Sequence, residues 1–134
     1  GYNMGDYLKH WLSMRRVIKD LPRIFHVNWF RRDAEGNFLW PGFGENMRVL
    51  EWIVNRCQGK GKGHETQLGW MPRYHEIRLE DLPEITEERF NQLMNVDMKE
   101  FKTELLNTES LYLDLYEYMP RELVYQRELL AGRM

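Results

Sequence analysis

The sequence predicts an α+β fold that is mainly helical with a small β-hairpin or sheet, and three observations lead to this class. Apolar residues recur with the period of a strand from Arg23 to Phe30, and with the period of a helix from Glu45 onwards. Residues 76–134 show only helical spacing. Because 134 residues can bury one core of useful size, we expect a single unit over residues 1–134.

The composition is that of a folded protein, and it narrows the classes of partner. Hydrophobic residues make up 43% of the chain, charged residues make up 30%, and the formal net charge is -2. This balance gives no electrostatic reason to expect nucleic acid or an anionic membrane as a partner. Cys57 is the single cysteine, and no apolar run reaches the ~18 residues of a membrane span, so we expect a cytoplasmic protein.

The first 40 residues predict a helix followed by a hairpin. Apolar spacings of three and four indicate a helix over Asn3 to Met14. From Arg23 to Phe30 bulky side chains alternate in period two and occupy both faces, which predicts an interior strand. Turn residues at Asp33 to Gly36 precede the short run Phe38 to Trp40, so we expect this run to return as a second strand.

A helix is expected from Glu45, with one apolar stripe facing the core. The residues of this stripe are Met47, Leu50, Ile53, Val54 and Cys57. Gln58 to Thr66 has the composition of an exposed, mobile loop, and its glycines and lysines lack the spacing of a phosphate-binding loop. Leu68 to Pro72 is expected to form another short strand.

The remainder of the chain predicts three helices. Thr86 to Met94 is the first and is short, and Asp97 occupies the position of an N-cap for the second. One apolar stripe of this second helix alternates steps of four and three, which is typical of a face packed on a core. Its residues are Phe101, Leu105, Thr108, Tyr112, Leu115 and Met119. Pro120 ends this helix and suits the first turn of the last one.

Gly42 to Asn46 brings two glycines, an aromatic ring and an amide together where the strand pattern changes into the helix pattern. Glycine on both sides of Phe43 allows positive φ, so the ring can leave the local packing. An aromatic face and a nearby amide can hold a flat polar ring, because one stacks on it and the other binds its edge. A Gly-rich turn with Phe43 in the core explains the same residues, and spacing alone favours that interpretation.

Residues for catalysis or metal binding do not cluster in the sequence. No His-x-x-x-His, Cys-x-x-Cys or carboxylate cluster has metal-ligand spacing, so we expect no complete metal site. Cys57 falls on the expected apolar stripe, which predicts a buried and unreactive thiol. These features together indicate a binding segment without catalytic residues.

Three runs within Leu21 to Trp52 are distinctive: Arg-Ile-Phe-His-Val-Asn-Trp-Phe-Arg, Phe-Leu-Trp-Pro-Gly-Phe-Gly-Glu-Asn and Arg-Val-Leu-Glu-Trp. Together they resemble the C-terminal segment of the GTP-dependent phosphoenolpyruvate carboxykinase family. The similarity extends to Asp6 to Leu12 and to Leu123 to Leu130, and it becomes loose after residue 76. Thr66 to Pro72 departs from the family's usual Thr-Pro-Ile-Gly-Tyr-Val-Pro but keeps the framing Thr, Gly and Pro.

The resemblance implies part of the larger C-terminal nucleotide-binding domain of the carboxykinase fold, with a guanine-pocket segment at 21–57 and a helical C-terminal segment at 76–134. Members of the family convert oxaloacetate and GTP to phosphoenolpyruvate, GDP and CO2, using manganese together with magnesium on the nucleotide. The resemblance implies that Phe30 and Phe43 enclose the base and that Phe38 lines the pocket. It also implies that Asn46 hydrogen-bonds the guanine edge, so GTP or GDP is the expected ligand.

In this family the phosphate loop, the metal ligands, the substrate arginines and the mobile lid precede the matched segment. We therefore expect a C-terminal fragment without catalytic or metal-binding residues, inactive alone, whose partners are a guanine nucleotide and the remainder of the enzyme. Unpaired strand edges and uncovered apolar faces also predict self-association into a homo-oligomer. A free-standing interaction or regulatory module derived from this segment is the alternative.

Overall fold

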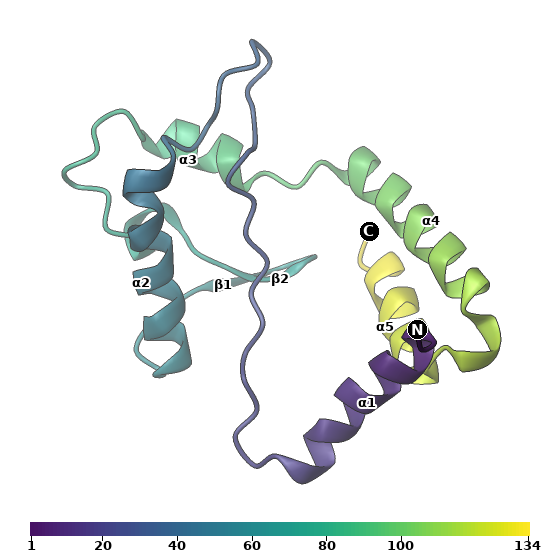
Figure 1. Ribbon diagram of the computed structural model, residues 1–134. Coiled ribbons are helices and arrows are strands. Elements are labelled where there is room, and N and C mark those ends of the chain that lie inside the picture. Colours follow the sequence, from purple (N-terminus) through teal and green to yellow (C-terminus); the bar gives the residue numbers. More distant parts are fainter. The chain divides into compact units, whose positions relative to one another are not determined.

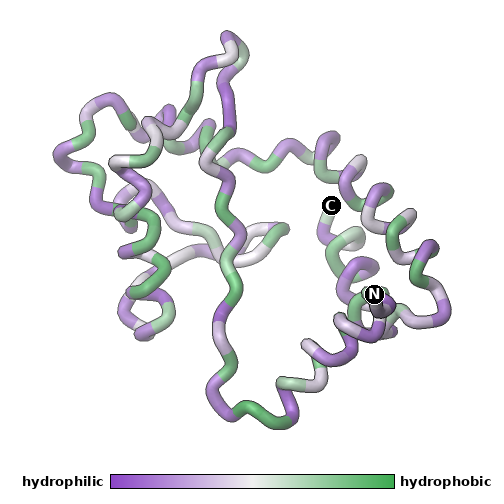
Figure 2. Tube along the Cα trace, in the orientation of Figure 1, coloured by the Kyte–Doolittle hydropathy of each residue, from purple (hydrophilic) through white to green (hydrophobic).

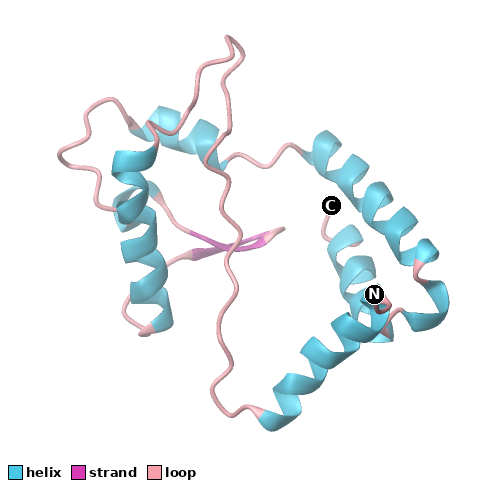
Figure 3. Ribbon diagram, in the orientation of Figure 1, coloured by secondary structure: helices cyan, strands magenta, loops and turns pink.

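The computed structural model describes residues 1–134, which form two compact units (Figure 1). Residues 1–22 and 96–134 make up the first, termed the helical unit, and residues 23–95 make up the second, termed the hairpin unit. Helices predominate and the only regular strands are two short ones (Figure 3), so the expected α+β class is confirmed. That residues 1–134 act as one unit stays a prediction.

The helical unit contains α1 (Met4–Val17), α4 (Met98–Asp114), the 3-10 turn η3 (Tyr116–Tyr118) and α5 (Arg121–Ala131). Side-chain caps begin two of these helices. Asn3 accepts a hydrogen bond from the Gly5 N–H at the start of α1, and Asp97 accepts two at the start of α4. α5 packs on α4, where Arg127 donates to the Leu105 carbonyl at 3.2 Å. The helices predicted for this part of the chain, including the Asp97 cap, are confirmed. α4 ends at Asp114 and η3 follows it, so the prediction that Pro120 ends this helix was wrong.

The apolar stripe predicted for the second helix is shielded from solvent on α4 and in the turn that follows it. Leu105 and Met119 are buried, and the other four members are half-buried. On α1, Gly5 lies directly against η3, where a Cβ atom added at this glycine would be 2.5 Å from the Tyr118 carbonyl oxygen. The absence of a side chain at Gly5 therefore permits the contact between these two elements.

The hairpin unit contains η1 (Phe43–Glu45), α2 (Asn46–Cys57), β1 (His64–Thr66), β2 (Gly69–Met71), η2 (Tyr74–Glu76) and α3 (Glu87–Met94). The strand expected within Leu68 to Pro72 and the helix expected at Thr86 to Met94 are confirmed. Gly59 ends α2 with a φ of +73°, as a glycine stop should. β1 lies inside the segment predicted to be a loop, and that part of the prediction was wrong.

β1 pairs with β2 as an antiparallel hairpin in which His64 faces Met71 and Thr66 faces Gly69. Two features of its turn explain why the loop composition did not prevent pairing. Gly69 has a φ of +133°, and the Thr66 hydroxyl donates to the Gly69 carbonyl at 2.8 Å. The short turn therefore holds two strands of only three residues each.

One core holds the hairpin unit together, and it joins Trp40, α2, the segment after η2, and α3. The buried members are Trp40, Trp52, Ile77, Leu79, Leu82, Ile85 and Phe90. Phe90 and Ile85 are each 1% exposed and form its centre. Tyr74 packs edge-on against Phe90, with ring centroids 5.7 Å apart. Residues 77–85 have no regular structure, yet they supply four of the seven buried side chains.

Residues 23–30 are extended but form no strand, so the predicted interior strand was wrong. The alternation itself is real: Phe25, Val27 and Trp29 are half-buried, whereas the residues between them are exposed. Figure 2 shows hydrophobic and hydrophilic residues interspersed along this segment. No neighbouring strand pairs with its backbone. The alternation with period two therefore predicted the extended backbone correctly. A β-strand also requires hydrogen bonds to a neighbouring strand, which this segment lacks.

The face of α2 that packs on the core differs from the predicted stripe. Trp52 is buried and Val49 and Ile53 are half-buried, whereas Met47, Leu50 and Val54 are exposed. Helical spacing is satisfied by both faces, and the large Trp52 side chain fills the core. The same error affects the prediction for the Cys57 thiol, which was placed on this stripe.

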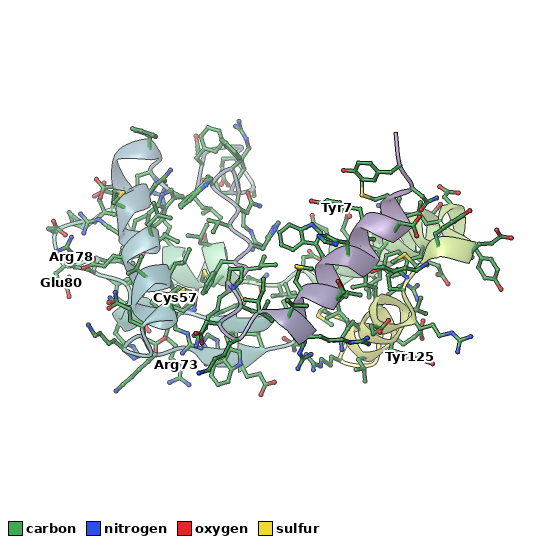
Figure 4. All side chains as sticks on the ribbon, turned by 60° about the horizontal axis from the view of Figure 1, so that its bottom comes forward. Tyr7, Cys57, Arg73, Arg78, Glu80 and Tyr125 are labelled. Atoms are coloured by element: carbon green, nitrogen blue, oxygen red, sulfur yellow. The ribbon has the colours of Figure 1, made fainter.

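Cys57, labelled in Figure 4, is exposed, so the prediction of a buried thiol was wrong. It lies on the exposed stripe with Leu50 and Val54 and not on the face that carries Trp52. The prediction failed because it placed this stripe against the core. Among all the helices, none is both long enough and apolar enough to cross a membrane.

Candidate functional site

The hairpin at residues 31–39 positions the first two predicted site residues. Asp33 closes its turn by accepting backbone hydrogen bonds from Glu35 at 3.1 Å and Asn37 at 2.8 Å. Gly36 adopts a φ of +88° at the end of this turn. Desolvation acts to raise the pKa of Asp33, but the hydrogen bonds from Asn37, Glu35 and Gly36 outweigh it and lower the pKa. The carboxylate therefore stays ionised and keeps the turn closed.

Phe30 and Phe38 meet at the open end of this hairpin. Their ring centroids are 6.3 Å apart at an interplanar angle of 62°, an edge-to-face arrangement. Arg32 pairs with Phe38 across the hairpin, and its guanidinium carbon lies 4.0 Å from the centre of the Phe38 ring. Phe30 is 72% exposed and Phe38 is 44% exposed. The two rings thus form an aromatic surface that is open to a ligand.

Phe43 lies in the turn between the hairpin and α2. Its side chain is 92% exposed, so the interpretation that made it a core residue was wrong. Gly42 has a φ of +110° and begins the 3-10 turn, while Gly44 has open space where a Cβ atom would stand. The two glycines allow the backbone to turn sharply, and the ring between them points into solvent.

Asn46 is the first residue of α2 and is half-buried. Its Oδ1 atom accepts a hydrogen bond from the indole N–H of Trp40 at 2.8 Å. Trp40 is 2% exposed and belongs to the core. An amide with its oxygen engaged in this way still has two Nδ2 hydrogens to donate. Asn46 can therefore present a donor to a polar ring.

Two arginines hold the hairpin on α3. Arg89 of α3 donates to the carbonyl of Leu39 at 3.0 Å and to that of Phe38 at 2.8 Å. Arg31 donates to the carbonyl of Leu93 at 3.0 Å and also to that of Asn95. Arg89 thus donates from α3 to hairpin carbonyls, and Arg31 donates from the hairpin to carbonyls at the end of α3, so the bonds run in both directions and fix the backbone that carries the aromatic pair.

Arg48 fixes the first turn of α2, where Asn46 lies. Its guanidinium is 2.5 Å from the Glu45 carboxylate and 2.6 Å from that of Asp81, and the Arg48 side chain is only 11% exposed. Hydrogen bonds to Asp81 and Glu45 raise the pKa of Arg48, and the bond from Arg48 lowers the pKa of Asp81. The start of α2 is therefore tied to residues 78–81 by a charged link.

A depression of about 900 Å³ lies on the α3 side of the hairpin. Its lining consists of Arg31, Arg32, Asp33, Ala34, Glu35, Leu39, Glu87, Glu88, Asn91, Gln92 and Asn95. It contains none of the four predicted site residues and no aromatic ring, and its charges are of mixed sign. The depression is therefore separate from the predicted site residues.

The structure brings some of the predicted residues together and leaves others apart. Phe30 and Phe38 form one contact pair, whereas Phe43 and Asn46 lie on η1 and at the start of α2. No three His, Cys, Asp or Glu side chains are placed so that they could hold a metal ion. Trp40 and Arg89 were absent from the predicted site because nothing in the local sequence indicates their contacts.

The comparisons with known proteins agree on one family. The family described as "Phosphoenolpyruvate carboxykinase C-terminal P-loop domain" matches residues 1–133. The chain is 42% identical over 134 residues to "Phosphoenolpyruvate carboxykinase [GTP]" of Anaeromyxobacter sp. (strain K), covering 100% of this chain and 22% of that relative. It is 46% identical over 137 residues to "Phosphoenolpyruvate carboxykinase, cytosolic [GTP]" of Gallus gallus, covering 100% and 21%.

A third relative, "Phosphoenolpyruvate carboxykinase [GTP]" of Treponema pallidum (strain Nichols), is 41% identical over 137 residues and is covered to 22%. The chain thus spans about a fifth of the length of the curated relatives it matches. All of these alignments include 100% of the chain, so both units, and not only residues 21–52, carry the similarity.

Proposed function

The chain belongs to the GTP-dependent phosphoenolpyruvate carboxykinase family, and on this premise we propose that it supplies the guanine pocket of such an enzyme. One observation carries the proposal most strongly: Phe43 is 92% exposed on a turn that begins α2, three residues before the half-buried amide of Asn46. A large apolar ring held in solvent beside a free amide donor is ready to receive a flat polar ligand.

In the proposed pocket, Phe30 and Phe43 enclose the base and Phe38 lines the site. The Phe30 ring has the edge-to-face contact with Phe38 on one side, and Arg32 covers the Phe38 ring. Stacking on each ring contributes about 1–3 kcal/mol and does not distinguish one base from another. Selectivity for guanine must therefore come from the amide.

Asn46 provides this selectivity in our proposal. Its Nδ2 group donates to guanine O6, and its Oδ1 atom accepts from the guanine ring N–H through its second lone pair, the first being used by Trp40. Adenine presents an amino donor and a ring acceptor at the same two positions. It would leave buried partners unpaired, which disfavours it strongly.

We propose that the complete enzyme converts oxaloacetate and GTP to phosphoenolpyruvate, GDP and CO2. The described residues do not fit the metal ions of that reaction, since no cluster of metal-binding side chains is present. Manganese, magnesium, the phosphate clamp and the oxaloacetate site would accordingly belong to parts of the carboxykinase outside these 134 residues. The role of this chain is to hold and select the base.

The 134 residues by themselves should bind nucleotide weakly and should not catalyse the reaction. Stacking supplies about 1–3 kcal/mol per base, whereas association costs at least ~4 kcal/mol. Without a phosphate clamp the balance is near zero, so the dissociation constant should be about millimolar or weaker. Phosphoenolpyruvate formation by the purified chain would contradict this part of the proposal.

The test of the pocket is a titration with GDP, GTP and ATP on the full-length product of the gene, followed by tryptophan fluorescence. A guanine-selective change is expected, because the Trp40 indole contacts Asn46 directly. Phe43→Ala and Asn46→Ala should each weaken it. If neither variant alters guanine-nucleotide affinity, the proposed pocket is wrong.

We also propose that the isolated 134-residue chain self-associates. Ile24 is 89% exposed, Phe30 is 72% exposed, and the extended backbone at 23–30 has no sheet partner. Such edges and apolar groups favour contact between copies. Light scattering at rising concentration should show a dimer or larger species. A constant monomer mass at high concentration would contradict this expectation.

A further inference from the structure

Trp40 donates the one hydrogen bond that fixes how the Asn46 amide is turned. The distance from the indole Nε1 to Asn46 Oδ1 is 2.8 Å. An indole N–H can only donate, so the amide atom that faces it must be the oxygen. Trp40 is 2% exposed and is held in the core of the hairpin unit, so this donor cannot move away.

From this geometry we propose that Trp40 is a positioning residue that sets purine selectivity by locking the Asn46 amide with its nitrogen toward the base. This inference rests on the proposed function, because it assumes that a purine occupies the site. Trp40 does not touch the base itself. It acts through Asn46 alone.

The restraint sets selectivity because each orientation of the Asn46 amide is complementary to a different purine. With Oδ1 toward Trp40, the free Nδ2 hydrogens of Asn46 face the ligand and match the O6 acceptor of a 6-oxopurine. Adenine would require the amide to turn over so that oxygen faces its amino group. The Nδ2 hydrogens would then meet the Trp40 N–H, and two donors would oppose each other in a half-buried place.

Neighbouring contacts make a local adjustment of Asn46 difficult. Arg48, two residues later, is bound to Glu45 and Asp81, so the first turn of α2 cannot shift as a whole. Trp40 itself follows Leu39, which is 4% exposed and whose carbonyl accepts from Arg89. Both ends of the hydrogen bond are therefore anchored, and only the amide torsion remains free.

The chain contains a matched control for this inference. Trp52 is also buried, at 6% exposed, lies in the same core, and donates its indole N–H to a carbonyl, that of Lys62, at 2.9 Å. Replacing either tryptophan by phenylalanine removes one indole N–H and a similar volume from one core. Only Trp40→Phe removes the restraint on Asn46.

The experiment measures the affinities of GDP and ADP by calorimetry for the full-length gene product and its variants. Because the two nucleotides share their phosphates, the ratio of their affinities reports on the base alone. Trp40→Phe should reduce the preference for GDP about tenfold, since a single hydrogen bond no longer opposes amide rotation. Trp52→Phe should lower the melting temperature comparably and leave the ratio unchanged within about twofold.

A second substitution keeps the inference testable if Trp40→Phe does not fold. Benzothienylalanine at position 40 replaces the N–H by sulfur and preserves the size of the ring system. It should reduce the ratio to the same extent with little loss of stability. A retained preference for GDP in either folded variant, equal to that of Trp52→Phe, would overturn the positioning role of Trp40.

The outcomes separate this inference from the pocket itself. If Phe43→Ala and Asn46→Ala weaken GDP binding but the Trp40 variants keep the selectivity, the pocket stands and the lock is wrong. If Phe43→Ala and Asn46→Ala leave GDP binding unchanged, the proposed pocket fails and the lock fails with it.

Discussion

The Phe43 ring should contribute to binding and almost nothing to folding. Its side chain is 92% exposed, so Phe43→Ala removes few packed contacts, and the free energy of unfolding should change by no more than about 0.5 kcal/mol. In the proposed pocket the same ring stacks on the base and supplies about 1–3 kcal/mol. Since ~1.4 kcal/mol is tenfold in affinity, GDP binding should weaken by about 5- to 150-fold.

Phe90→Ala provides the opposite case within the same unit. Phe90 is 1% exposed and packs against Tyr74, so its truncation should lower the free energy of unfolding by about 3–5 kcal/mol. Urea denaturation and calorimetric titration of GDP, both on the full-length gene product, measure the two quantities separately. The proposed binding role of Phe43 would be refuted if the Phe43→Ala variant lost as much stability as the Phe90→Ala variant. It would also be refuted if the Phe43→Ala variant bound GDP with normal affinity.

Three further substitutions test the contacts that hold each unit. Gly5→Ala forces a Cβ atom to within 2.5 Å of the η3 backbone and should cost about 1–3 kcal/mol in urea denaturation, whereas Gly132→Ala, with its nearest contact at 3.5 Å, should be neutral. Because Arg48 lowers the pKa of Asp81, that carboxylate stabilises the fold above its ordinary pKa of 3.8 and stops doing so as the pH falls through its folded pKa. Asp81→Asn should therefore reduce the melting temperature at pH 7, and the difference from wild type should vanish in acid. Arg89→Ala removes the donor to two hairpin carbonyls and should lower the free energy of unfolding by about 2 kcal/mol, with faster proteolysis of residues 31–39; unchanged cleavage there would argue against its anchoring role.

Local rules predicted the elements whose causes lie within a few residues. The Asp97 cap and the hairpin turn at Asp33 both form hydrogen bonds that sequence neighbours determine. The α4 stripe was predicted because its apolar residues recur at steps of four and three along the chain. Elements of this kind can be predicted without knowing which distant residues contact them.

Distant partners explain what the sequence did not reveal. Arg89 reaches the carbonyl of Phe38, 51 residues away, and no pattern near either residue indicates that bond. The extended run at 23–30 alternates like a strand, but its classification depends on whether another strand lies beside it. The four candidate site residues came from the family resemblance, and spacing alone gave the wrong environment for Phe43.

The two faces of α2 show how this division serves the proposed site. Trp52, Val49 and Ile53 pack the helix on the core, whereas Met47, Leu50 and Val54 are exposed. A helix whose only role was packing would not need a second apolar face in solvent. In the proposed pocket, the exposed ring of Phe43 precedes this helix, and Asn46 in its first turn is held by the hydrogen bond from the buried Trp40.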